Sequence, residues 1–158
     1  TENFNRNLRY VIPLKVFDKE QFLFYLFSVW TKPIPINYSV NVLKALECTE
    51  YKEYVSDRAL FIGDFNTPTK KEKRKEYDAL IGKGLIDCAR TEDILKPTYS
   101  HSEEINYFTA DYCFATDKMK TSFEISESIS EFDNDIKGKD KYQGLSDHCP
   151  IFIEIKEI

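Results

Sequence analysis

The sequence predicts an α+β domain with mixed sheets, and three observations indicate this class. The chain has 158 residues, of which 42% are hydrophobic, and this is enough for one buried core. Apolar stretches of strand type are interspersed with segments whose apolar residues recur at helical spacing. Neither an internal repeat nor a linker divides the chain. We therefore expect one domain over residues 1–158.

The first half of the chain predicts two strands, a helix and a third strand. Residues 8–16 and 22–30 are rich in β-forming residues and are separated by a polar turn. The second of these strands is apolar on both faces, as expected for a strand covered on both sides. Apolar residues recur at roughly helical spacing from Tyr38 to Val55, which predicts a helix, and residues 59–63 predict a short strand.

The second half predicts one more helix and then mainly strands. Thr69 and Glu72 have the form of a capping box and open a helix to about Ile81, where a glycine-containing turn follows. The later strands are predicted from β-forming or alternating apolar residues, with a polar loop at 130–144 before the last of them. These strands cover residues 105–116, 122–129 and 151–155.

The charge balance argues against a protein that holds DNA mainly through its phosphates. Lys and Arg number 22 against 27 Asp and Glu, which gives a net charge of −5. Proteins that bind DNA in this way usually carry a clear basic surplus. A local basic rim stays compatible with this composition.

Cysteine spacing and apolar run lengths indicate the compartment. The four cysteines are scattered without a CxxC pair, which favours buried free thiols in a reducing compartment, and we expect a cytoplasmic protein. The longest apolar run, residues 22–30, is too short to span a bilayer, so no membrane partner is expected.

Residues 61–68, FIGDFNTP, place a carboxylate and an amide at the end of an apolar strand. Asp64 and Asn66 are two residues apart, so in an extended backbone their side chains leave on the same side. Such groups can bind a hard cation through oxygen and orient water or a phosphate. The alternative interpretation is an Asx turn, in which these residue types are common.

A second polar group precedes the last predicted strand, in residues 145–155, LSDHCPIFIEI. Asp147 and His148 are adjacent, so both reach one site only if the backbone turns there. Imidazole is the side chain best suited to proton transfer near neutral pH. The alternative interpretation is a surface turn without a chemical role.

Asp111 is a charged residue within the otherwise apolar residues 110–116, ADYCFAT. A buried carboxylate needs a partner, and an imidazole N–H is a good one. We predict that Asp111 accepts a hydrogen bond from His148, as the aspartate does in hydrolase triads. Exposure of Asp111 at a sheet edge is the alternative.

Together these stretches resemble the endonuclease/exonuclease/phosphatase superfamily, which has the DNase I-like fold. Three motifs occur in the order found in that family: GDFN at 63–66, DYCF at 111–114 and SDHCP at 146–150. PTY at 97–99 also resembles the segment that precedes the family's DY strand. The resemblance implies a partial DNase I-like β-sandwich with flanking helices, and metal-dependent hydrolysis of phosphodiester bonds of the nuclease type.

The resemblance also implies a role for each matched residue. Asp64 would position or deprotonate the attacking water, Asn66 would hold that water or a phosphate oxygen, and His148, steadied by Asp111, would contact the scissile phosphate. Asp147 would bind Mg²⁺ or Mn²⁺, with Asp64 and Asn66 as further metal ligands. Either Asp64 or His148 could be the base. The expected partner is nucleic acid or another phosphodiester substrate.

Two departures from the family pattern bear on activity. The family's early Asn and its metal-binding Glu have no counterpart, so the chain resembles the C-terminal part of a longer domain and we expect it to be weakly active or inactive alone. Residues 30–32 read Trp-Thr-Lys where many members have His or Tyr. The alternative functions are a phosphatase acting on a small phosphoester and a non-catalytic member that binds nucleic acid or protein. Unpaired sheet edges would also be compatible with a dimer.

Overall fold

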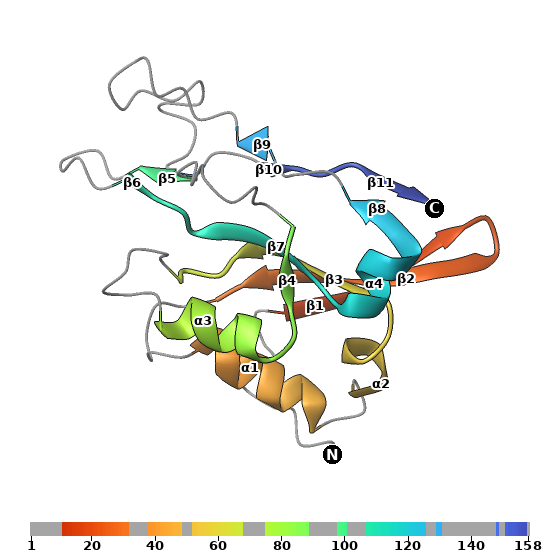
Figure 1. Ribbon diagram of the computed structural model, residues 1–158, viewed down its shortest axis with the longest axis horizontal. Helices are drawn as coiled ribbons and strands as arrows, with labels where there is room; N and C mark the ends of the chain where they lie inside the picture. Colours follow the sequence, from red (N-terminus) through yellow and green to blue (C-terminus); the bar gives the residue numbers. More distant parts are fainter. Residues whose placement is uncertain are drawn as a thin grey trace.

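A five-stranded mixed sheet lies at the centre of the domain (Figure 1). Its strand order is β1–β2–β3–β7–β4, with β2 and β3 parallel and all other neighbours antiparallel. The bounds of the strands are β1 Val11–Asp18, β2 Gln21–Trp30, β3 Ala59–Asp64, β7 Asp111–Ala115 and β4 Ile86–Asp87. The computed structural model describes residues 11–31, 38–48, 52–67, 75–88, 98–100, 107–125, 129–130, 148 and 151–157.

The predicted pair of N-terminal strands is present as β1 and β2. They are antiparallel, and Asp18 lies opposite Gln21 across a tight turn. Lys19 adopts a φ of 52° in this turn, a left-handed conformation that short connections between strands commonly need. β3 then runs parallel to β2, and the connection between them carries two helices.

Helices α1 and α3 cover one face of the sheet (Figure 1). Their apolar sides pack on aromatic residues of the central strands, where Phe27 of β2 and Phe61 of β3 are stacked with ring centroids 4.6 Å apart. Leu46 of α1 and Leu80 of α3 are almost completely buried in this cluster. The helix bounds are α1 Tyr38–Glu47, α2 Lys52–Val55, α3 Lys75–Gly82 and α4 Asp117–Ser122.

The opposite face of the sheet is covered by α4 and by short strand pairs (Figure 1). Phe24 of β2 meets Phe123 at a centroid distance of 5.5 Å, and Met119 of α4 is fully buried in the same cluster. β2 is therefore packed on both faces, as its apolar sequence predicts. The strand pairs are β8 Phe123–Ile125 with β11 Ile155–Glu157, β9 Ile129–Ser130 with β10 Ile151–Phe152, and β5 Tyr99–Ser100 with β6 Tyr107–Phe108.

The structure corrects several predicted element boundaries. The helix expected from Tyr38 to Val55 is two helices, because α1 ends at Glu47 and α2 begins at Lys52. The strand expected over 122–129 begins with the end of α4, whose N-cap Thr116 accepts a hydrogen bond from the Met119 N–H. The strands expected over 105–116 and 151–155 are each divided in two. Residues 69–74 of the predicted second helix lie outside the described residues.

Two further expectations concern membranes and thiols. None of the helices in the described part of the chain has the length and apolar character that a membrane crossing requires. Cys88 and Cys113 are free and buried, as predicted, whereas Cys48 is free and exposed. Cys149 lies outside the described residues.

Candidate active site at one end of the central sheet

Asp64 and Asp111 lie directly opposite each other at one end of the central sheet. Asp64 is the last residue of β3 and Asp111 is the first of β7, and the antiparallel register pairs them. Side chains of directly opposed residues share a face of the sheet. Trp30, the last residue of β2, is the register partner of Asp64 on its other side. One row across three strands therefore carries these three side chains.

His148 joins this row through Asp111. Its Nδ1 lies 2.9 Å from Asp111 Oδ2, so the hydrogen bond predicted from the sequence is present. The side chains are 29% and 14% exposed, respectively, so the pair is shielded but reachable from solvent. With Nδ1–H donating to the carboxylate, the orientation of the ring is fixed and Nε2 is the nitrogen that can address a substrate.

The Asp64 carboxylate is held by Asn66. The backbone N–H of Asn66 donates to Asp64 Oδ1 at 2.8 Å, and its side-chain Nδ2 donates to Asp64 Oδ2 at 2.7 Å. Nδ2 also donates to the Thr31 carbonyl at 2.8 Å, so both of its hydrogens are used. The first of these bonds is the Asx turn of the alternative interpretation. The turn does not exclude a chemical role, because it fixes the orientation of the carboxylate and leaves the side-chain oxygen Oδ1 of Asn66 to bind a ligand.

The backbone around this turn is fixed by the close approach of Gly63 to β2 and by hydrogen bonds to the Phe65 carbonyl. Gly63 has a φ of +137°, and a Cβ at this position would come within 2.0 Å of the Val29 carbonyl oxygen. Asn66 has a φ of 48°, in the left-handed region that Asn tolerates better than most residues. Thr31 and Ser39 both donate their hydroxyls to the Phe65 carbonyl, and both are buried. The loop that carries Asp64 and Asn66 is thus tied to β2 and α1.

Burial and charge raise the pKa of the Asp64 carboxyl to about 6 from its ordinary value of 3.8. Loss of solvent is the largest cause, and the neighbouring charge of Asp111 adds to it. The hydrogen bonds from Asn66 and the proximity of His148 act in the opposite direction. At neutral pH the carboxylate is therefore mostly ionised but more basic than an ordinary aspartate.

No protein-family model and no curated protein sequence matches the chain. Solved structures do match it. The endonuclease domain of TRAS1, a telomere-specific non-LTR retrotransposon, superposes with a TM-score of 0.61 at 15% identity, covering 94% of this chain and 63% of that one.

Two further structures show the same likeness. The 3′ phosphatase NExo from Neisseria, bound to a product DNA hairpin, gives a TM-score of 0.59 at 15% identity over 94% of this chain and 65% of its own. An endonuclease/exonuclease/phosphatase family protein from Bacteroides thetaiotaomicron gives a TM-score of 0.58 at 19% identity, covering 89% of this chain and 53% of its own. The chain has the DNase I-like fold. It spans less than two thirds of the length of each of these three structures.

A divalent metal is the cofactor that a DNase I-like fold implies, and the described residues only partly suit one. Asp64 and the carbonyl oxygen of Asn66 offer the hard oxygen ligands that Mg²⁺ prefers. Among the described residues, however, no group of three His, Cys, Asp or Glu side chains is placed to hold a metal ion. Asp147, a metal ligand predicted from the sequence together with Asp64 and Asn66, lies outside the described residues. The described side chains therefore do not form a complete metal centre by themselves.

Sequence reasoning missed the residue that positions Asp111 in the candidate site. Thr98 Oγ1 accepts hydrogen bonds from the N–H groups of Ala110 and Asp111, both at 2.9 Å. These bonds fix the start of β7, so the direction of the Asp111 side chain depends on a residue 13 positions earlier. The only signal in the sequence is the PTY segment at 97–99, whose resemblance to the family segment assigns it no role.

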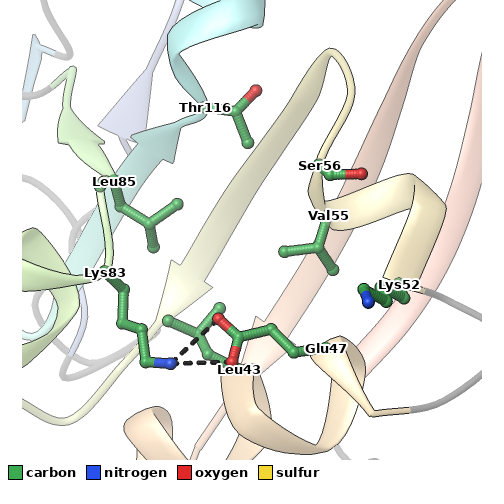
Figure 2. A pocket seen from close by; sticks show the side chains of 9 residues that line it. Leu43, Glu47, Lys52, Val55, Ser56, Lys83, Leu85 and Thr116 are labelled. Atoms are coloured by element: carbon green, nitrogen blue, oxygen red, sulfur yellow. Dashed lines mark hydrogen bonds and ion pairs between the residues drawn. The ribbon is translucent and has the colours of Figure 1, made fainter.

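A separate pocket lies at the other end of β7 (Figure 2). It has a volume of about 540 Å³ and reaches Thr116, which follows the last residue of β7, whereas Asp111 is the first. Lys83 and Glu47 line it and form an ion pair of 2.8 Å. This pocket is thus not part of the candidate site. Lys32, the last residue of the Trp-Thr-Lys segment, lies outside the described residues.

Proposed function

We propose that this domain hydrolyses phosphodiester bonds of nucleic acid. The observation that carries the proposal is the Asp111–His148 hydrogen bond of 2.9 Å beside Asp64, the register partner of Asp111. An oriented imidazole next to a carboxylate of raised pKa provides an acid and a base within one site. The DNase I-like fold, shared with a retrotransposon endonuclease and a 3′ phosphatase, supports this class of reaction.

Asp64 is the group to which we assign activation of water. A carboxyl with a pKa of about 6 is mostly ionised at neutral pH and still basic enough to accept a proton during attack. Each carboxylate oxygen has two acceptor positions, so the bonds from Asn66 leave room for a water molecule. The oxygen of that water forms the new bond to phosphorus, and its proton moves to Asp64.

His148 is assigned to the phosphate. Asp111 holds its Nδ1, so Nε2 is the atom that can donate to a phosphate oxygen or to the leaving oxygen. When the bond from phosphorus to the leaving oxygen breaks, that oxygen gains negative charge, which a donated hydrogen bond or proton stabilises. Most of the rate enhancement in phosphoryl transfer comes from such positioning and charge stabilisation.

Mg²⁺ or Mn²⁺ is part of the proposal, held by Asp147 with Asp64 and Asn66. When bound, the ion would neutralise charge on the phosphate. Support comes from the oxygen ligands of Asp64 and Asn66 and from the resemblance of the SDHCP segment at 146–150 to the family's metal-binding motif. Titration calorimetry with Mn²⁺ tests this without turnover. Binding that persists unchanged in Asp147→Ala would contradict the assignment.

The proposal applies to the protein as a whole, because the chain spans only 53% to 65% of the three structures compared above. We propose, from the order of the motifs, that these residues correspond to the C-terminal part of such a domain. A phosphatase acting on a small phosphoester is the second candidate. It is favoured by the net charge of −5, since an acidic protein gains little electrostatic binding energy from a long polyanionic substrate.

A panel of substrates separates these candidates. Plasmid DNA, abasic-site DNA, single-stranded RNA and bis-p-nitrophenyl phosphate are incubated with the full-length protein and Mg²⁺ or Mn²⁺, because this chain alone is expected to be weakly active or inactive. His148→Ala serves as the loss-of-function variant and Asp18→Ala as the matched control, because Asp18 is an exposed carboxylate at the far end of the β1–β2 hairpin. Hydrolysis lost in the first variant and kept in the second supports the proposal. Equal hydrolysis by both, or none on any substrate, contradicts it.

A further inference from the structure

Trp30 is a large aromatic side chain exposed at the candidate site. It is the only tryptophan in the chain, and 58% of it is exposed. Its neighbours along the chain are buried, with Val29 at 5% and Thr31 at 1% exposure. The Thr31 N–H also donates to the Asp64 carbonyl at 2.8 Å. The backbone that carries the indole is thus fixed, while more than half of the Trp30 surface is accessible.

The indole lies on the same face of the sheet as the two carboxylates. Along β2, Phe27 and Val29 belong to the cluster under the helices, whereas Phe24 and Leu26 face the opposite side. Alternation therefore places Trp30 on the side opposite the helices. Asp64 lies two residues after Ile62, and Asp111 lies two residues before Cys113. The same alternation therefore places both carboxylates on that side.

The strand register also brings Trp30 and the two carboxylates close to one another. Trp30 pairs with Asp64 across β2 and β3, and Asp64 pairs with Asp111 across β3 and β7. Neighbouring strands lie about 4.8 Å apart, so the backbone of Trp30 is one strand from Asp64 and about two from Asp111. A phosphate bound between Asp64 and His148 would bring the adjoining nucleoside within reach of the indole.

We propose that Trp30 is a stacking platform for a nucleobase of the substrate, an inference that rests on the proposed function. Bases offer their faces only when they are unstacked, so the platform favours single-stranded nucleic acid or a nucleotide turned out of a duplex. The acidic net charge of −5 makes a stacking contribution more useful, because phosphate contacts alone would hold nucleic acid weakly. A small phosphoester without a base would not use the platform.

The other explanation for this exposure is a docking surface for a protein. Ile12 and Leu14 of β1 are exposed on the same face, at 59% and 46%. Exposed Ser28, however, lies two residues before Trp30 on that face of β2, so the apolar side chains do not form a continuous row along β2 to the site. The indole is in line with the carboxylates, which favours the substrate as its partner.

Fluorescence of the single tryptophan tests the proposal directly. The chain is titrated with oligothymidylate of eight nucleotides in EDTA, so that no turnover is needed. Stacking predicts quenching that saturates with the oligonucleotide. A matched oligomer whose sugars carry no bases should quench little. Quenching that is equal for both oligomers, or absent for both, overturns the proposal.

Variants supply a second measurement that does not depend on the indole signal. With labelled oligothymidylate and fluorescence anisotropy, Trp30→Ala should weaken binding about 5- to 150-fold, and Trp30→Phe should weaken it less, because a phenyl ring still stacks. Leu14→Ala is the matched control and should leave Kd unchanged. If Leu14→Ala weakens binding as much as Trp30→Ala, the surface binds through general apolar contact and the proposal is wrong.

The two proposals fail in distinguishable ways. Absence of hydrolysis with normal base-dependent quenching would contradict the proposed function and leave the stacking platform in place. Hydrolysis that depends on His148 but shows the same KM in Trp30→Ala as in the parent would contradict the platform alone.

Discussion

Asp64 and Asp111 are register partners in the antiparallel pairing of β3 and β7, so two carboxylates face the same side at the same sheet end. Such a pair is unfavourable unless each charge is compensated. Asp111 is compensated by His148 at 2.9 Å, and Asp64 by hydrogen bonds from Asn66 and by its proximity to His148. Burial, with a smaller contribution from the charge of Asp111, raises the pKa of Asp64 to about 6. The site is therefore arranged for proton transfer at a cost in stability.

The first prediction concerns the pH dependence of stability. Because the folded-state pKa of Asp64 lies above its ordinary value, the folded protein binds this proton more tightly than the unfolded chain. Its contribution to stability is full at low pH and is lost as pH rises from about 4 to about 6. Asp64→Asn should remove this dependence of the free energy of unfolding on pH. Between about pH 4 and about pH 6 the dependence amounts to a change on the order of 1–2 kcal/mol after allowance for solvent screening.

Urea unfolding between pH 3.5 and 7.5 measures this effect. The same variant should lower activity by about 100-fold or more, because it cannot accept a proton. An unchanged slope of stability against pH would mean that Asp64 is an ordinary solvated carboxylate in this protein.

The second prediction uses the coupling between the two carboxylates. Asp111→Asn replaces the carboxylate beside His148 Nδ1 with a neutral amide, whose NH2 group can donate to Nδ1 and hold the ring in the other tautomer, so kcat should fall by about 100-fold or more. The same change removes a negative charge that raises the pKa of Asp64, so that pKa should fall below about 6. The acidic limb of the pH–rate profile should therefore move to lower pH. An acidic limb that stays at the same pH, or moves to higher pH, would show that this limb reports a group other than Asp64.

The third prediction concerns the glycine that precedes Asp64. A Cβ on Gly63 would lie 2.0 Å from the Val29 carbonyl oxygen, and its φ of +137° is one that other residues rarely adopt. Gly63→Ala should therefore destabilise the fold by about 2 kcal/mol or more and shift β3 against β2.

Gly82→Ala at the end of α3 is the matched control, because a Cβ on Gly82 would meet no atom within 4 Å. It should be neutral or stabilise the protein by up to about 1 kcal/mol. Thermal unfolding of both variants decides the question. Equal melting temperatures would show that the backbones of β2 and β3 can separate at Gly63 without loss of stability.

Much of the site was predictable because its chemistry lies at strand ends. Polar Asp64 and Asp111 interrupt apolar runs, and this pattern predicts an end or a buried partner for each. The bond from His148 to Asp111 followed from the cost of burying a carboxylate. The register between Asp64 and Asp111 could not be predicted, because it depends on which strands become neighbours after β3.

Other features could not be predicted because they depend on the backbone of distant segments. Thr31 and Thr98 act by donating to or accepting from main-chain groups 34 and 13 residues away, and such partners leave no pattern in one sequence. Helix α4 was missed for a different reason. Its signal is a short one, Thr116 as N-cap with Asp117 in the first turn, set between two strong strand patterns.

The fourth prediction tests Thr98 as a positioning residue. Thr98→Val keeps the shape of the side chain but leaves the N–H groups of Ala110 and Asp111 without their acceptor. An unsatisfied buried donor costs about 1–3 kcal/mol, so the free energy of unfolding should fall by that order. Since the start of β7 aims Asp111 at His148, kcat should fall while KM changes little. Thr98→Ser restores the hydroxyl and should recover both stability and kcat, and failure of this rescue would show that Thr98 contributes through packing of its methyl group instead.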